Sequence, residues 1–265
     1  MSYVSNPVDG HSTYYESIGH GPPLMLYQGA FGSSDNWHDR GYVDAFKDDY
    51  RVILIDSRAH GRSDSPHDIE SYSTDLQVGD MLAVLDELQI EKMHYVGYSY
   101  GGWFAYALLK FAPERLMSVA IGGKDPFPKE PNQYEKMIEI LGVGIEQFVL
   151  WQEENNGVRF PEPLRTRRLK LDAEALRVLC INYEEENVPG ILESLDNITM
   201  TCMFYAGTDD PIISDVKRAA ALVPMSEMVV LDGFNHPDGF YKRESVQPIL
   251  ADFLSRANRN VNVVG

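Results

Sequence analysis

A serine stands between two glycines in the segment HYVGYSYGGWF, residues 94–104. The segment begins with a pattern typical of a strand and ends with one typical of a helix. Ser99 is flanked by Gly97 and Gly101, which gives the arrangement G-x-S-x-G at a strand-to-helix junction. Glycines allow a turn so tight that side chains two positions from the serine would collide. The pattern predicts that this turn presents Ser99 as a nucleophile.

A serine nucleophile needs a base that takes its proton and an acid that orients the base. Where a serine nucleophile lies at such a strand-to-helix turn, the acid and then the histidine are expected to follow it in the sequence, on loops after later strands. The segment FYAGTDDPI (204–212) offers Asp209 and Asp210, and LDGFNHPDGF (231–240) offers His236. His236 is the one histidine among seven that lies in a suitable loop. The residues alone leave both aspartates open as the acid.

The oxyanion that forms when a serine attacks a carbonyl group needs backbone N–H donors. The N–H that follows the nucleophile, that of Tyr100, is expected to point toward it. A second donor is expected from the loop QGAFGSSDNW, residues 28–37, which follows an apolar run. Its glycines expose N–H groups, and either Ala30 or Phe31 could supply the second donor.

Short apolar runs bounded by Gly, Pro and Asp predict the strands that position these loops. They lie at residues 23–27, 50–56, 92–97, 116–122, 199–205 and 227–232. Helical patterns lie between them, at residues 72–90, 101–115, 214–223 and 240–257. Several runs lack polar alternation, which is typical of a parallel sheet covered on both faces. The alternation predicts an α/β fold with a mostly parallel central sheet flanked by helices.

The alternation of strands and helices breaks between residues 124 and 197. This segment opens with a proline-rich loop and continues with helical patterns only, at residues 133–141, 145–155, 174–186 and 188–195. Ligands bind at the carboxyl ends of strands in open α/β sheets. The sequence therefore predicts a small all-helical lid, residues 124–197, inserted before the last two strands. The core is expected to comprise residues 1–123 and 198–265.

Composition narrows the classes of function. The chain has 265 residues, of which 44% are hydrophobic and 24% charged, as is ordinary for a soluble globular protein. Its formal net charge of -17 disfavours nucleic acid and anionic membrane as partners. The N-terminus lacks the pattern of a signal peptide, and the two cysteines, Cys180 and Cys202, are expected to be free thiols. We expect a cytoplasmic monomer or homodimer, without metal or organic cofactor.

Five segments in order resemble the α/β-hydrolase fold superfamily, in its lid-bearing branch of esterases and lactonases. They are GHGPPLMLYQGAFGSSDNW (19–37), DSRAHGRSD (56–64), GYSYGG (97–102), GTDDPI (207–212) and GFNHP (233–237). The resemblance covers nearly the whole chain and is specific to the superfamily, but not to a substrate. It implies that Asp210, rather than Asp209, is the acid. It also implies that Ala30 and Tyr100 supply the oxyanion hole.

Two positions depart from the pattern of the superfamily. Gln28 stands where a histidine usually hydrogen-bonds the backbone of the oxyanion loop. Because the Gln28 amide also offers a donor and an acceptor, the oxyanion hole is expected to survive with altered detail. Ala59 stands where a glycine is usual, in the turn that also contains Asp56, Arg58 and His60. We interpret these three polar residues as structural rather than catalytic.

The predicted reaction is acyl transfer through a covalent intermediate. Ser99 attacks the carbonyl group of an ester, His236 removes its proton, and Asp210 holds the imidazole. The expected partner is a small to medium, largely apolar carboxylic ester. Aromatic residues near the site loops are expected to line its pocket: Phe31, Phe127, Trp151 and Phe234.

Other activities use the same three residues and stay open from the sequence. They are lactone hydrolysis, cleavage of a C–C bond beside a carbonyl group, amide hydrolysis and perhydrolysis. A slow-turnover receptor for a small molecule is a further alternative. Epoxide hydrolases and haloalkane dehalogenases are disfavoured, because the resemblance implies an aspartate as their nucleophile where this chain has Ser99.

Overall fold

A computed structural model of the protein describes residues 2–128, 130–186 and 188–264. Eight strands form one sheet in the order β1-β2-β4-β3-β5-β6-β7-β8. Their bounds are β1 Ser2–Ser5, β2 Ser12–Ile18, β3 Pro23–Tyr27, β4 Arg51–Ile55, β5 Met93–Tyr98, β6 Leu116–Gly122, β7 Thr201–Gly207 and β8 Ser226–Leu231. The pairings from β4 through β8 are parallel, whereas β1 with β2 and β2 with β4 are antiparallel. The predicted mostly parallel sheet is confirmed.

The carboxyl ends of the six parallel strands meet at one edge of the sheet. The loops after β3, β4, β5, β7 and β8 therefore come together there, although they are far apart in the sequence. The two antiparallel strands β1 and β2, at the opposite side of the sheet from β8, were not predicted. Their residues are partly exposed and lack a continuous apolar run, so they carry a weaker strand signal.

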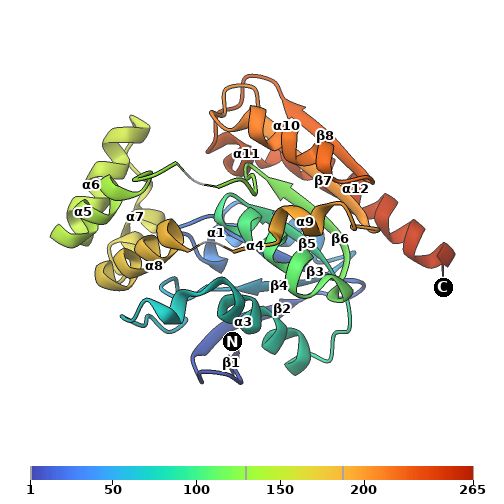
Figure 1. Ribbon diagram of the computed structural model, residues 1–265, viewed down its shortest axis with the longest axis horizontal. Helices are drawn as coiled ribbons and strands as arrows, with labels where there is room; N and C mark the ends of the chain where they lie inside the picture. The colour runs from blue at the N-terminus through green and yellow to red at the C-terminus, as the bar shows by residue number, and fades with distance from the viewer. Residues whose placement is uncertain (1, 129, 187, 265) are drawn as a thin grey trace.

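Helices cover both faces of the sheet (Figure 1). Their bounds are α1 Ser34–Asp39, α2 Tyr42–Phe46, α3 Thr74–Glu87, α4 Tyr100–Phe111, α5 Glu135–Val143, α6 Ile145–Asn156, α7 Glu162–Arg168, α8 Ala173–Glu185, α9 Ile191–Leu195, α10 Ile213–Leu222, α11 Asp238–Tyr241 and α12 Arg243–Val264. The helical pattern at residues 240–257 is divided at Lys242, between α11 and α12, and Pro248 lies inside α12. None of the helices in the described part of the chain is long and apolar enough to cross a membrane.

Two apolar layers sandwich the sheet. Met25 and Tyr27 of β3 pack with α3, α4 and α10 on one face, and Leu24 and Leu26 pack with α2 and α12 on the other. Successive side chains of a strand point to opposite faces, so a continuous apolar run serves both layers. Burial of this strand on both faces fixes the position of the loop that follows it.

Helices α5–α9 form the segment between β6 and β7. Four of them, α5–α8, gather beside the carboxyl ends of the strands, at the left of Figure 1. Helix α7 was not predicted. Helix α9, by contrast, packs against α4 of the core, through buried Ile191 and Leu195. The end of the insertion is thus anchored on the central layer.

Candidate active site

Ser99 lies between the end of β5 and the start of α4 in a strained backbone conformation. Its φ of 54° and ψ of -111° are unusual for a residue with a side chain. A Cβ atom at Gly97 would overlap the carbonyl oxygen of Gly101, and one at Gly101 would overlap that of Tyr27. The Ser99 N–H donates to the carbonyl of Gly122 on β6 at 2.8 Å. The two glycines are therefore required by the turn that lifts Ser99 clear of the sheet.

Ser99, His236 and Asp210 form one hydrogen-bonded chain, although they come from three separate loops. Nε2 of His236 lies 3.0 Å from Oγ of Ser99, and Nδ1 lies 2.8 Å from Oδ2 of Asp210. An ionised carboxylate only accepts hydrogen bonds, so Nδ1 carries the proton and Nε2 is free to accept one from the serine. This is the arrangement in which an imidazole can act as a general base.

Asp210, not Asp209, contacts the histidine. The carboxylate of Asp210 is buried and also accepts a hydrogen bond from the N–H of Ile212 at 3.2 Å. Asp209 is exposed, and the hydroxyl of Thr208 donates to it. The choice that the residues alone left open is thus resolved by the geometry of the loop after β7.

Tyr98 supports His236 from the other side of the elbow, a part that the sequence did not predict. Its hydroxyl donates to the main-chain carbonyl of His236. The two rings also pack together, with centroids 5.4 Å apart. Strand alternation shows that Tyr98 faces away from Tyr95, but no pattern in the sequence names the partner that it reaches on a loop 138 positions later.

The two predicted oxyanion donors lie at the mouth of the site. Tyr100 is the first residue of α4, so its N–H has no acceptor within the helix. The N–H of Phe31 donates to Nε2 of His60 at 2.8 Å and is therefore occupied. Of the two residues considered for the second donor, Ala30 is the one whose N–H this bond leaves available.

His60, rather than Gln28, hydrogen-bonds the backbone of the oxyanion loop, which is the altered detail at this position. Within the described residues neither polar atom of the buried Gln28 amide has a hydrogen-bond partner. His60 is buried on the neighbouring loop, with Nδ1 2.8 Å from the carbonyl oxygen of Arg58. Burial lowers the pKa of His60 to about 4. The ring is thus neutral at neutral pH, and Nε2 accepts the Phe31 N–H.

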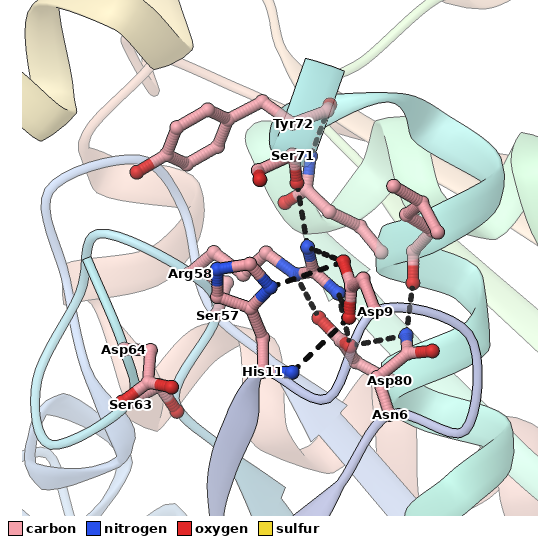
Figure 2. Close-up of polar contacts among 12 residues, drawn as sticks. Asn6, Asp9, His11, Ser57, Arg58, Ser63, Asp64, Ser71, Tyr72 and Asp80 are labelled. Atoms are coloured by element: carbon pink, nitrogen blue, oxygen red, sulfur yellow. Dashed lines mark hydrogen bonds and ion pairs between the residues drawn. The ribbon is translucent and has the colours of Figure 1, made fainter. Parts of the chain in front are cut away.

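Arg58 has a structural part, as interpreted from the sequence (Figure 2). Its guanidinium donates to both oxygens of Asp80, at 2.7 and 2.8 Å, and to the carboxylate of Asp9. It also donates to the carbonyl of Ser71 at 2.8 Å. Burial alone would lower the pKa of Arg58, but these carboxylates outweigh it and raise the pKa. The cluster ties β4's loop to α3 and the N-terminal turn.

Two cavities adjoin Ser99 and His236. The smaller, of about 340 Å³, has largely apolar and aromatic walls, to which the insertion contributes Tyr134, Met137 and Leu179 among others. The larger, of about 850 Å³, is bounded by the oxyanion loop, by α6 and α7 and by the loop after β8. A substrate held at the serine could therefore extend in two directions, one apolar and one more polar.

Of the four aromatic residues predicted to line the pocket, one lines the cavities beside Ser99 and three do not. Phe31 lines both cavities, whereas Phe127, Trp151 and Phe234 line neither. The Phe127 ring lies under Arg218, and the Phe234 ring lies under Lys242. Trp151 stacks on Phe148 within the insertion. Closeness in sequence to a site loop does not fix the direction of a side chain, which is why these three positions misled the prediction.

The comparisons with known proteins agree with this fold. Residues 22–169 match a family model described as the alpha/beta hydrolase fold. Over 249 residues the chain is 25% identical to a candidate 2-succinyl-6-hydroxy-2,4-cyclohexadiene-1-carboxylate synthase of Bacillus subtilis (strain 168), covering 88% of this chain and 90% of that protein.

Two further similarities differ in extent: one covers less than half of this chain, and the other covers nearly all of it at low sequence identity. The chain is 33% identical to epoxide hydrolase 4 of Mus musculus over 121 residues, which are 45% of this chain and 33% of that protein. Among solved structures, a hydrolase from Pseudomonas aeruginosa PA01 superposes with a TM-score of 0.84 at 20% identity, covering 96% of this chain and 97% of that one. The latter likeness is one of fold.

Proposed function

Because the chain belongs to the alpha/beta hydrolase fold family, we propose that it is a serine hydrolase that cleaves carboxylic esters through an acyl-enzyme intermediate. The single observation that carries the proposal is the continuous hydrogen-bonded chain from Ser99 through His236 to Asp210. The three groups have the roles of nucleophile, general base and orienting acid. Family membership alone would leave the chemistry undetermined, since one fold hosts many reactions.

In the proposed first step, Oγ of Ser99 attacks the ester carbonyl while Nε2 of His236 takes its proton. The oxyanion accepts hydrogen bonds from the N–H groups of Ala30 and Tyr100. When the intermediate collapses, the imidazolium gives its proton to the departing alcohol and the acyl group stays on the serine. Asp210 stabilises the imidazolium throughout without taking a proton itself.

In the second step a water molecule replaces the alcohol. His236 takes a proton from the water as it attacks the acyl-enzyme, and the same oxyanion donors act again. Collapse of the second tetrahedral intermediate breaks the bond to Ser99, whose oxygen regains a proton from His236. The products are a carboxylic acid and a free enzyme, so the reaction consumes one water molecule.

The size and lining of the two cavities support small to medium substrates. The smaller cavity, with its apolar and aromatic walls, suits a short hydrocarbon part. Residues of α5, α6, α7 and α8 line one cavity or the other. We therefore also propose that residues 124–197 act as a lid that selects the substrate. The chain is partly similar to an epoxide hydrolase. Ser99 argues against that reaction, because the resemblance implies an aspartate as the nucleophile of epoxide hydrolases.

The test combines a turnover assay with an active-site label. Purified protein should hydrolyse 4-nitrophenyl acetate or butyrate, and Ser99→Ala should abolish turnover. A fluorophosphonate should add once to the chain by intact mass, with the adduct on Ser99, and His236→Ala should largely prevent it. Labelling without ester turnover would indicate another acyl-transfer reaction or a slow receptor. Absence of labelling on the folded protein would contradict an activated serine.

A further inference from the structure

Arg168, the last residue of α7, is a buried cation in the wall of the larger cavity. Its side chain is only about 8% exposed. Its Nη1 donates to the side-chain oxygen of Gln152, and its guanidinium lies 4.3 Å from the centre of the Phe160 ring. Its Nε is buried and has no hydrogen-bond partner among the described residues. No carboxylate in that part of the chain lies within ion-pair distance of it.

Arg58 is a buried arginine with a structural role, and it is paired with carboxylates. Arg58 is held by the two carboxylates of Asp9 and Asp80 (Figure 2). Arg168 has neutral neighbours instead, and burial lowers its pKa with only partial compensation from Tyr241. A buried charge without a counter-charge destabilises the fold, because its hydration is lost and not replaced. Such a group is retained most readily where a ligand supplies the missing charge.

Gln28 adds a second unsatisfied group to the same cavity. It is about 1% exposed, and both atoms of its amide lack a partner among the described residues. It lies on the loop after β3, so it faces the cavity from the core, whereas Arg168 faces it from the insertion. An unpaired buried amide destabilises the fold, because it has lost its hydrogen bonds to water. Two such groups, one from the core and one from the insertion, line the same cavity and point to a missing polar occupant.

The other charged groups of this cavity already have partners or are more exposed. Asp238 pairs with Lys242 at 3.0 Å, and Arg159 pairs with Glu162 at 3.1 Å. Arg40 lies over the ring of Tyr241, 4.2 Å from its centre, and is partly exposed. Asp209 is exposed near the rim.

We propose that the larger cavity binds a carboxylate group of the substrate, with Arg168 as its counter-charge and the amide of Gln28 as a further donor. The inference rests on the proposed function, because it makes the substrate an ester that carries a free carboxylate on the part that extends away from the apolar cavity. Arginine suits this task because its planar guanidinium presents several donors to a carboxylate. Arg168 is thus a specificity-determining residue, not a catalytic one.

The first experiment compares matched esters in a pH-stat at pH 7.5. Monomethyl glutarate is set against dimethyl glutarate, and butyryloxyacetate against its methyl ester, so that the carboxylate is on the acyl side or on the alcohol side. In at least one pair, the kcat/KM of the wild-type protein for the charged ester should exceed that for the neutral ester by about 10-fold or more. Arg168→Met should reduce that ratio by about 10–100-fold.

Arg167→Met is the matched control. Arg167 is the preceding residue of α7 but pairs with Asp39 at the surface and does not line the larger cavity. This variant should keep the wild-type ratio. Faster turnover of the neutral ester in both pairs by the wild-type protein would overturn the proposal while leaving the proposed function intact.

The second experiment needs no turnover and so separates the two proposals. Glutarate and butyrate, each at 10 mM, are added to Ser99→Ala and to the double variant Ser99→Ala/Arg168→Met, and unfolding is followed by calorimetry. Glutarate should raise the Tm of the first variant, and this rise should be lost in the second. A rise that persists without Arg168, or no rise in either variant, would contradict the carboxylate site even if every ester proved inert.

The third experiment measures the Tm of the ligand-free variants, which distinguishes a role of Arg168 in ligand recognition from a structural role. Arg168→Met nearly conserves the side-chain volume and removes an unpaired buried charge, so the ligand-free variant should be as stable as the wild-type protein or more stable. A loss of Tm greater than that of Arg58→Met would show instead that Arg168 serves the fold, as Arg58 does.

Discussion

The main-chain N–H of Phe31 donates to Nε2 of His60 at 2.8 Å, so the loop after β4 holds the loop after β3. Phe31 has a positive φ of 64°, a conformation that a residue with a side chain adopts only when its surroundings enforce it. The hydrogen bond is part of that enforcement. It aims the adjacent Ala30 N–H without involving Gln28, the residue at the position where the superfamily usually has its histidine.

Removal of the His60 acceptor should lower turnover more than binding. His60→Leu leaves the Phe31 N–H unpaired, and a displacement of the neighbouring donor by about 1 Å can cost roughly 10²-fold in rate. We expect kcat for a 4-nitrophenyl ester to fall by about 10–100-fold, with KM changed less than 3-fold. The surface variant His38→Gln is the control and should retain full activity. Equal kcat in both variants would show that the loop does not depend on His60.

His60 should also make the fold sensitive to acid. Its pKa is lowered by burial from 6.5 to about 4, so the unfolded chain binds more protons than the folded one between these values. The stabilisation is fully present above pH 6.5 and is lost as pH falls toward 4, by about 3 kcal/mol. Urea unfolding of the wild-type protein and of His60→Leu from pH 4 to 7 checks this. The difference between their free energies of unfolding should shrink toward low pH; a constant difference would contradict it.

The hydroxyl of Tyr98 should matter for the position of His236. Tyr98→Phe removes the hydrogen bond to the main-chain carbonyl of His236, and we expect kcat to fall by about 3–10-fold with a loss of about 1 kcal/mol in stability. Tyr72→Phe is the matched control, because the Tyr72 hydroxyl donates to the carbonyl of Pro66 at 2.7 Å, away from the site. The control should lose similar stability at unchanged kcat. Equal kcat effects in the two variants would reduce the contact to a structural one.

The strain at Ala59 should be removable. Ala59 has a φ of 64°, where a Cβ atom costs about 1–2 kcal/mol and glycine does not. Ala59→Gly should therefore raise the free energy of unfolding by about 0.5–1 kcal/mol, even after the gain in unfolded-state entropy. Ala83→Gly, inside α3, should lower it by about 1 kcal/mol instead. Calorimetric unfolding of both variants decides; a destabilised Ala59→Gly would mean that the methyl packing outweighs the strain.

Local sequence patterns predicted the sheet and the site to the extent that both depend on order along the chain. The apolar runs identified all six parallel strands, and the order of Ser99, Asp210 and His236 predicted which loops meet. Parallel strands bring their carboxyl ends together whatever the details of packing, so order alone suffices. The antiparallel strands β1 and β2 were not identified, because their partly exposed residues form no continuous apolar run.

The residues that hold the site in place could not be predicted, because their contacts depend on side-chain directions across separate loops. His60 was interpreted as structural. Its hydrogen bond to Phe31 depends on how the loops after β3 and β4 are placed relative to one another, which the sequence does not show. Tyr98 reaches a carbonyl on a loop far along the chain. The pocket residues Phe127, Trp151 and Phe234 were chosen by sequence distance, and their rings turn elsewhere. The directions of these side chains cannot be predicted from the spacing of residues or from composition.

The position of the helical insertion has a consequence for how the chain is synthesised. Strand β6 lies in the middle of the finished sheet, but its neighbour β7 follows only after residues 123–200. At about 5–20 residues per second, a ribosome needs several seconds to make that stretch. During that interval β6 is an open, apolar sheet edge on the nascent chain, which is a template for aggregation. Asp210 and His236 emerge later still, so the first half of the chain can fold before any triad exists.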